Sequence, residues 1–321
     1  FSFQQIIETS AKMLVVFVGG YLTAGGANAI NMWYDRDIDP IMRRTSNRAI
    51  PSGMVSPNNA LIFGVSISII GVAWFVVMAN QVAAFWAAFS IFFYVFIYTA
   101  WLKRSTVQNI VIGGIAGSTP PVIGWAAASD DLSIKSDSAI NFFDSIFSLG
   151  SFMPWFLFLL IFLWTPPHFW ALALYRSEEY EKVSIPMMPG IKGPEKTLFT
   201  MKIYAIILVL LSFLSPFALN NLEFDEYLFH IFCWTNVILS TWYASTVFKI
   251  DLNEQKDKTG RIPTAARSFW VSMLYLALIF VVVVMASIGT IGGIIGTLVS
   301  IIIIIRNQLK AKKEINPFSS L

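Results

Sequence analysis

The chain has 321 residues, 56% of them hydrophobic and 13% charged, whereas about 25% of the residues of an ordinary soluble domain are charged. This composition excludes a soluble domain and predicts a membrane protein with several transmembrane helices. A net charge of +3 is too small and too dispersed to indicate nucleic acid binding. The single cysteine, Cys233, excludes an intrachain disulfide and a cysteine-ligated metal cluster, and we expect it to be a small buried hydrophobic residue.

The N-terminus begins with Phe1, Ser2 and Phe3 and has no starting methionine. It contains neither a signal peptide nor an Arg-rich transit sequence. We therefore expect a truncated or processed start.

Hydrophobic runs near the length of about 20 residues that crosses a bilayer recur along the chain. Only the short segments 287–289 and 292–293 interrupt 269–305, which is therefore either one overlong helix or a tight hairpin of two. We predict an all-α polytopic membrane protein, with a single transmembrane domain over 1–306 and a short basic tail over 307–321. The predicted spans lie at about 12–30, 60–79, 82–101, 109–128, 152–174, 198–219, 227–248 and 269–288, with a shorter ninth run at 290–305.

Lys and Arg residues gather in alternate loops, and cytoplasmic loops of membrane proteins are enriched in these residues. Fifteen of them lie in the loops 31–59, 102–108, 175–197 and 249–268, whereas the intervening loops contain only Lys135. We predict that the first set faces the cytoplasm from a bacterial inner membrane, or the matrix from a mitochondrial inner membrane. The tail should lie on the same side, which requires the ninth run to return across the membrane; it carries Arg306, Lys310, Lys312 and Lys313.

The densest polar chemistry lies in the stretch NMWYDRDIDPIMRRTSNRAIPSG, which begins at Asn31. Asn31, Asp35 and Asp39 are spaced i, i+4, i+8, which places them along one face of a helix, while Asp37 points away. Pro40 disfavours helical geometry in the residue before it, so we expect the helix to end about there.

Two carboxylates at the C-terminal end of a helix need a cationic partner, because the helix dipole is negative there. Mg²⁺ binds carboxylate oxygens and completes its shell with substrate phosphates. Arg43, Arg44 and Arg48 follow in the sequence, and Arg presents a planar fork of donors suited to phosphate oxygens. The cluster predicts a metal-bridged diphosphate site facing the cytoplasm; the alternative is a set of salt bridges where a helix leaves the bilayer.

The stretch from Ala24 to Gly53 resembles the first aspartate-rich motif of the UbiA family of intramembrane prenyltransferases. Within it, the residues from Asn31 to Gly53 are similar to the sequence of the family branch that farnesylates protohaem. The resemblance covers residues 20–200 by motif and the remainder by hydropathy. The further matching motifs, in chain order, are Tyr98-x4-Lys103-Arg104, Asn109-Ile-Val-Ile-Gly-Gly, Pro120-Pro121-x-Ile-Gly-Trp125 and Pro167-His168-Phe-Trp-Ala-Leu-Ala-Leu-Tyr-Arg176, followed by Ile185-Pro186.

The resemblance implies a bundle of nine transmembrane helices around a central cavity, capped from the cytoplasmic side by two aspartate motifs. In the family the first motif closes the second helix, but here it closes the first, so we expect the family's first helix to be missing. The second motif is reduced to SEEY at 177–180, with Val183 where another acid is expected. Glu179 takes the place of the usual aspartate, so the resemblance allows a second Mg²⁺ site there but supports it less than the first.

The resemblance also implies residue roles. The catalytic, metal-binding residues are Asn31, Asp35 and Asp39, with Glu179 as a further metal ligand. The residues expected to bind substrate are Asn28, Arg43, Arg44, Arg48, Lys103, Arg104, His168, Arg176 and Glu179.

Several of these residues have a second interpretation. Lys103 and Arg104 are either diphosphate ligands or positively charged anchors at the end of a span. Asn28 either faces the cavity or hydrogen-bonds a neighbouring helix. His168 either contacts the porphyrin, as an iron ligand or propionate partner, or makes a hydrogen bond between helices. We expect His230, near the outer surface, to be a bystander.

Two proline pairs, Pro120-Pro121 and Pro166-Pro167, fall inside predicted spans. Proline frees backbone carbonyls that only protein or water can satisfy within a membrane. We therefore expect both spans to break and to form an irregular wall of the chamber.

The implied reaction is an electrophilic alkylation that uses Mg²⁺ as cofactor and farnesyl diphosphate and haem b as substrates. A vinyl group of haem b attacks the allylic cation and a hydroxyl is added, giving haem O. Haem A synthase and terminal-oxidase assembly proteins are the implied partners, besides the lipid bilayer. Two alternatives remain: a UbiA-type enzyme acting on an aromatic quinone precursor, which predicts a fuller second motif, and a cation-binding transporter, which predicts internal repeats.

Overall fold

The computed structural model describes residues 3–219, 226–258 and 260–315. All regular secondary structure in this part of the chain is helical, as predicted. The chain forms two compact units, residues 1–197 and 198–321. We describe each by itself.

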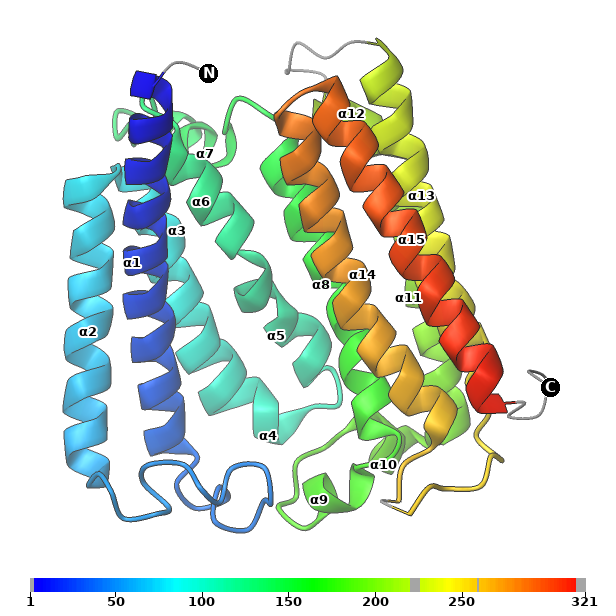
Figure 1. The fold of residues 1–321 in the computed structure, drawn as a ribbon. Coiled ribbons are helices and arrows are strands. Elements are labelled where there is room, and N and C mark those ends of the chain that lie inside the picture. Colours follow the sequence, from blue (N-terminus) through cyan, green and yellow to red (C-terminus); the bar gives the residue numbers. More distant parts are fainter. Residues whose placement is uncertain (1–2, 220–225, 259, 316–321) are drawn as a thin grey trace. The chain divides into compact units, whose positions relative to one another are not determined.

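The first unit begins with two long helices that pack along each other, α1 (Phe3–Tyr34) and α2 (Pro57–Met78) (Figure 1). Glycine allows their backbones to approach closely. A Cβ atom on Gly26 would lie 2.2 Å from Ser68 Oγ and 2.8 Å from the carbonyl oxygen of Gly64. Small residues at such crossings are typical of helices that associate within a membrane.

The next elements form two antiparallel segments beside α1. The first segment changes from α-helix to π-helix without a break, and the second consists of two separate helices. These elements are α3 (Gln81–Phe92), the π-helix η1 (Phe93–Leu102), α4 (Lys103–Ser105), α5 (Asn109–Ser118) and α6 (Pro120–Ala128).

The two proline pairs behave differently. The predicted break at Pro120 is confirmed, because α5 and α6 are separate helices. The break expected at Pro166 and Pro167 is wrong, because α8 (Met153–Ala173) continues through both residues. Packing against α5, where Gly114 lies next to Thr165, explains the difference, since neighbouring helices let membrane helices tolerate proline.

Three short helices complete the first unit: α7 (Ala139–Phe147), α9 (Ser177–Glu181) and α10 (Met188–Lys192). The 35–56 loop, α4, α9 and α10 gather at one end of this unit, and α7 lies at the other (Figure 1). Three of the loops that the charge pattern assigns to one side of the membrane therefore do share one end of the first unit.

The second unit contains α11 (Pro194–Ser212), which begins at the end of the first unit, and α12 (Ser215–Leu219), α13 (Glu226–Phe248), α14 (Pro263–Ser287) and α15 (Thr290–Ile315). Helix α13 packs against both α14 and α15. The chain reverses between α14 and α15 at Gly289, whose φ of +124° favours glycine. The 269–305 segment is therefore a hairpin of two helices.

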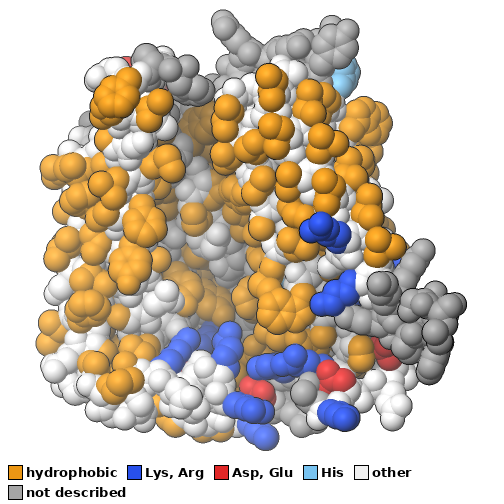
Figure 2. Space-filling model, viewed as in Figure 1, with side chains coloured by type: hydrophobic (Ala, Val, Ile, Leu, Met, Phe, Trp, Pro, Cys, Tyr) orange, Lys and Arg blue, Asp and Glu red, His pale blue; other side chains and the backbone are white. Residues whose placement is uncertain are grey.

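Among the described residues, seven helical segments are long and apolar enough to cross a membrane, and they correspond to seven of the nine predicted runs. The other two runs correspond to α11 with α12 and to α13. Hydrophobic side chains cover the flanks of the helices, and Lys and Arg side chains gather near the helix ends (Figure 2). The chain is an integral membrane protein.

Two smaller expectations concern α13. Cys233 is partly exposed, so it is not the fully buried residue we expected. His230 is exposed, which fits its expected position near a surface. The predicted tail begins within α15, and its last residues, 316–321, lie outside the described residues.

Candidate functional site

The three predicted metal ligands lie at the end of α1 and are buried, with exposed fractions of 4% for Asn31, 0% for Asp35 and 1% for Asp39. The helix ends at Tyr34, earlier than Pro40, and turns follow. Aspartate competes with helical backbone bonds, and three aspartates in five residues explain this early end. The Asp39 N–H still donates to the Asp35 carbonyl at 2.9 Å, so the face continues past the helix.

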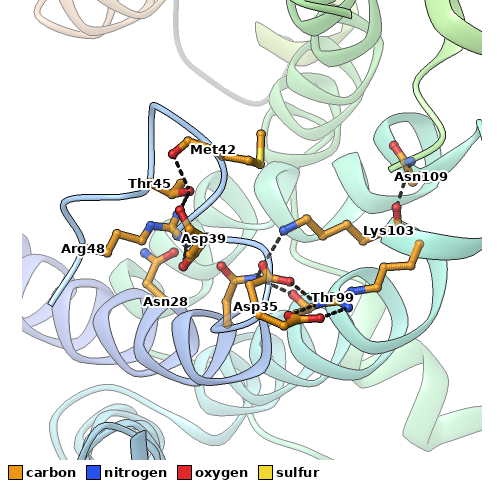
Figure 3. A network of polar contacts seen from close by, with 12 residues as sticks. Asn28, Asp35, Asp39, Met42, Thr45, Arg48, Thr99, Lys103 and Asn109 are labelled. Carbon is orange, nitrogen blue, oxygen red and sulfur yellow. Dashed lines mark hydrogen bonds and ion pairs between the residues drawn. The ribbon is translucent and has the colours of Figure 1, made fainter. Parts of the chain in front are cut away.

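Asp35 is the centre of a polar network (Figure 3). Its carboxylate accepts hydrogen bonds from Lys103 Nζ, from Arg104 Nη2 at 3.3 Å and from Asn31 Nδ2 at 2.9 Å. Asn31 Nδ2 also donates to Thr99 Oγ1 of η1 at 3.1 Å. The network joins the end of α1 to Thr99 of η1 and Lys103 of α4, so segments 68 residues apart in the sequence hold one buried carboxylate.

Arg104 also binds the aspartate that points away. Its guanidinium donates to both oxygens of Asp37 at 2.6 and 2.7 Å, and it lies 5.2 Å from the centre of the Tyr34 ring. The side chain of Asp37 is 57% exposed. The hydrogen bonds from Arg104 hold the pKa of Asp37 below its usual range. Arg104 therefore makes a surface ion pair as well as a buried contact.

Asp39 forms a second ion pair within the same loop. Arg48 Nη1 donates to its two carboxylate oxygens at 3.1 and 2.9 Å, and Thr45 Oγ1 donates to its carbonyl at 3.0 Å. Thr45 thereby fixes the backbone that carries the carboxylate. Arg43, one of the three predicted arginines, is exposed and is not among the residues that line the cavity beside these ion pairs.

A cavity of about 350 Å³ opens beside these ion pairs. Five of the predicted residues line it: Asn31, Asp39, Arg44, Arg48 and Lys103. Further lining comes from residues that sequence reasoning did not assign to the site, among them Tyr94, Tyr98, Asn109, Gly113, Trp164, Phe169 and Tyr180.

A second cavity of about 260 Å³ adjoins the first, because Tyr94 and Gly117 line both. Its remaining walls are mainly apolar and include Val16, Phe75 and Ile123. The larger cavity therefore carries the charged side chains, and the adjoining cavity has a mainly apolar wall.

Asn28 lies in the second cavity. It lines the wall, and its Oδ1 accepts a hydrogen bond from Tyr94 Oη at 3.3 Å. Both interpretations of Asn28 are therefore correct, since it faces a cavity and also bonds a neighbouring helix.

His168 lies behind the wall of the larger cavity. Its ring is 7% exposed and stacks on Trp164, with 4.2 Å between ring centres, and it meets Phe169 edge to face at 5.2 Å. Those two aromatic residues line the cavity. The lining of the cavity thus includes these two rings and not the imidazole of His168.

The second acidic segment contributes less than the first. Glu179 is paired with Arg176 at 3.9 Å, and the lining of the larger cavity includes Tyr180 from this segment. Among the described residues, no group of three or more His, Cys, Asp or Glu side chains is arranged to hold a metal ion. Asn31, Asp35 and Asp39 nevertheless supply hard oxygen donors, which fit Mg²⁺ when substrate phosphates complete its shell.

Comparison with known proteins gives the family. The sequence model of the UbiA prenyltransferase family matches residues 4–259. The chain is 42% identical over 274 residues to the protoheme IX farnesyltransferase of Beijerinckia indica, covering 85% of this chain and 76% of that protein. It is also 42% identical over 284 residues to the protoheme IX farnesyltransferase of Parvibaculum lavamentivorans, covering 88% and 79%.

Solved structures share the fold at low sequence identity. A digeranylgeranylglyceryl phosphate synthase superposes with a TM-score of 0.61 at 18% identity, covering 89% of this chain and 85% of that one. A UbiA homologue from Archaeoglobus fulgidus, solved with GPP and Mg²⁺ bound, gives 0.53 at 15% identity, covering 83% and 86%. The family model and the curated relatives indicate an enzyme and not a transporter: the chain belongs to the UbiA prenyltransferase family.

Proposed function

We propose that this chain transfers the farnesyl group of farnesyl diphosphate to a vinyl group of haem b, which gives haem O and releases diphosphate. One observation carries the proposal: a cavity lined by the buried Asp39 and by Arg44, Arg48 and Lys103 adjoins a mainly apolar cavity. The first suits a diphosphate and the second suits an isoprenoid chain. The names of the relatives described above support farnesyl as the group transferred and protohaem as its acceptor.

The basic side chains would hold the diphosphate. Lys103 and Arg48 neutralise Asp35 and Asp39 in the structure, and both line the cavity, so they are within reach of an anion that enters it. Arg44 adds a further positive charge, while Arg43, Arg104 and Arg176 are proposed to act from outside the cavity. Charge-assisted hydrogen bonds from these groups stabilise the leaving group as its bond to carbon breaks.

Mg²⁺ is the proposed cofactor. Asn31, Asp35 and Asp39 would hold it, and Glu179 is proposed as a ligand of a second ion. When bound, the metal would neutralise charge on the departing diphosphate as a Lewis acid. The carboxylates would then bind the metal ion, and the lysine and arginines that pair with them would donate hydrogen bonds to the phosphate oxygens.

The chamber walls would protect the allylic cation. Tyr94, Tyr98 and Trp164 line the cavity with aromatic surface, which excludes stray water from a reactive intermediate. The vinyl group of haem b would form the new carbon–carbon bond at the carbon that diphosphate leaves. After this coupling, a water molecule would add to the resulting cation and release a proton, which leaves the hydroxyl.

His168 is the proposed contact for haem. We expect His168→Ala to weaken haem b binding at least about tenfold, since neutral imidazole is a common iron ligand, and to leave farnesyl diphosphate binding unchanged. Haem titration followed by absorbance, beside a binding assay with farnesyl diphosphate, measures both. A haem spectrum and affinity equal to those of the unaltered chain would assign His168 to packing against Trp164.

The proposed function is tested by incubating the purified protein with haem b, farnesyl diphosphate and Mg²⁺. The expected result is haem O, identified by mass, with diphosphate released in equal amount. A prenylated aromatic quinone precursor, formed when haem b gives no product, would replace the proposed acceptor. The same preparation in sealed vesicles, with substrate added to one side only, tests whether the site faces the cytoplasm or matrix.

The wider setting is proposed on the same basis. The chain would act as one transmembrane domain, residues 1–306, in a bacterial or mitochondrial inner membrane. Haem A synthase or terminal-oxidase assembly proteins would receive the product.

A further inference from the structure

The cavity side of the segment from η1 to α4 has an unusual spacing. Tyr94, Tyr98 and Lys103 line the larger cavity and are separated by four and then five positions. In an α-helix each residue turns about 100°, so residues nine positions apart lie about half a turn from each other. An α-helix would therefore carry Lys103 away from the wall that Tyr94 occupies.

The opposite side of the segment is exposed and apolar. Phe92, Phe96 and Trp101 are 52%, 58% and 62% exposed, and Ala100 beside Trp101 is exposed as well. The outer face is therefore two residues wide at its end, whereas the inner residues Tyr94, Tyr98 and Lys103 repeat about every 4.5 residues.

The winding of η1 explains the inner spacing. The backbone N–H of Lys103 donates to the carbonyl of Tyr98, five residues earlier. Bonds from residue i to i+5 wind the chain with more residues in each turn than an α-helix has, so nine residues complete about two turns. Lys103 returns to the face of Tyr94, where its ammonium group binds Asp35.

Contacts from two neighbouring helices hold this winding. Asn31 of α1 donates to Thr99, whose exposed fraction is 0%. On α5, Gly113 leaves room for the ring of Tyr98, because a Cβ atom there would lie 2.3 Å from its Cδ2. Helices α1 and α5 therefore both contact the π-helix through residues that match its winding.

We propose that one additional residue in η1 positions Lys103 against Asp35 and the diphosphate, a role that rests on the function proposed above. Spacing of four then five equals an α-helical face, i, i+4, i+8, with one residue added. Removing a residue between Tyr98 and Lys103 therefore keeps both on one face of an ordinary α-helix. Adding a residue there moves the lysine off that face.

Deletion of Ala100 tests this geometry. Ala100 is exposed, and its removal shortens the inner and the outer spacing together. We expect the variant to fold and to bind farnesyl diphosphate with Mg²⁺ within about tenfold of the unaltered affinity. An alanine inserted after Ala100 should lose about a hundredfold or more in affinity, because Lys103 then leaves the cavity face and its charge-assisted contact with the diphosphate is lost.

The matched control is deletion of Ile112 in α5, an α-helix that lines the same cavity. Deletion of one residue from an α-helix rotates the following residues by about 100° relative to the preceding ones. This deletion should therefore lower the affinity for farnesyl diphosphate as strongly as the insertion does. Lys103→Ala should lower the affinity by the same factor in the unaltered chain and in the Ala100 deletion. Equal loss in both deletions, or a lysine that no longer matters after deletion of Ala100, overturns the proposal.

The winding itself can be measured without any ligand. Single cysteines at positions 92 to 101, in a chain carrying Cys233→Ser, take spin labels whose exposure to dissolved oxygen follows the outer face. The expected period is about 4.5 residues in the unaltered chain and about 3.6 after deletion of Ala100. A period of about 3.6 in the unaltered chain also overturns the proposal. Diphosphate binding as expected, with no transfer to haem b, counts against the proposed acceptor alone.

Discussion

Asp35→Asn should abolish farnesyl transfer while the protein stays folded. The substitution keeps the shape of the side chain but removes the charge that faces Lys103 and Arg104 at a site with no exposed surface. Asparagine is a poorer ligand for Mg²⁺ than a carboxylate, so the rate should fall at least about a hundredfold, as when one electrostatic contact to a transition state is lost. Turnover with haem b and farnesyl diphosphate measures the effect.

Asp37→Asn is the matched control for this experiment. It removes a carboxylate two residues away that also binds Arg104, but its side chain is largely exposed. Its turnover should stay within about threefold of the unaltered chain, since exposed ion pairs contribute little. Near-normal, Mg²⁺-dependent turnover of Asp35→Asn would rule out the proposed metal site, whereas unfolding of that variant would show up as lost helical signal.

The buried acidic face could be predicted because it follows from one short-range rule. Asn31, Asp35 and Asp39 recur at helical spacing, and Asn31 indeed donates to Asp35. Their cationic partners were also predictable, since charge must be balanced beside a membrane. The distribution of Lys and Arg between loops further indicated that Lys103 would lie near that face.

The rest depends on packing that periodicity does not encode. Helix α8 continues through its proline pair and packs against α5, which no local sequence pattern states. Glu179 and Arg176 share a motif with the site, but they pair with each other. Tyr98 stood in a motif with Lys103, but neither it nor Tyr94 was assigned to the chamber wall, because their shared face with Lys103 depends on the π-helix.

The ion pair between Asp39 and Arg48 separates a structural role from a functional one. If it only closes the end of a helix, replacing both charges by amides should be nearly neutral for stability and for turnover, because neither group is left unpaired. If Asp39 is a metal ligand and Arg48 a diphosphate ligand, Asp39→Asn with Arg48→Gln should retain the fold and still lose at least about a hundredfold in turnover.

We expect the second result, because both side chains line the cavity and a salt bridge alone does not require that. Arg48→Gln by itself keeps the carboxylate, so it should mainly raise the KM for farnesyl diphosphate, by about tenfold for one lost charge-assisted contact. Thermal unfolding and steady-state kinetics on the three variants distinguish the cases. Removal of a catalytic contact should lower turnover about a hundredfold. A double variant whose turnover falls by no more than about tenfold would show that the ion pair has only a structural role.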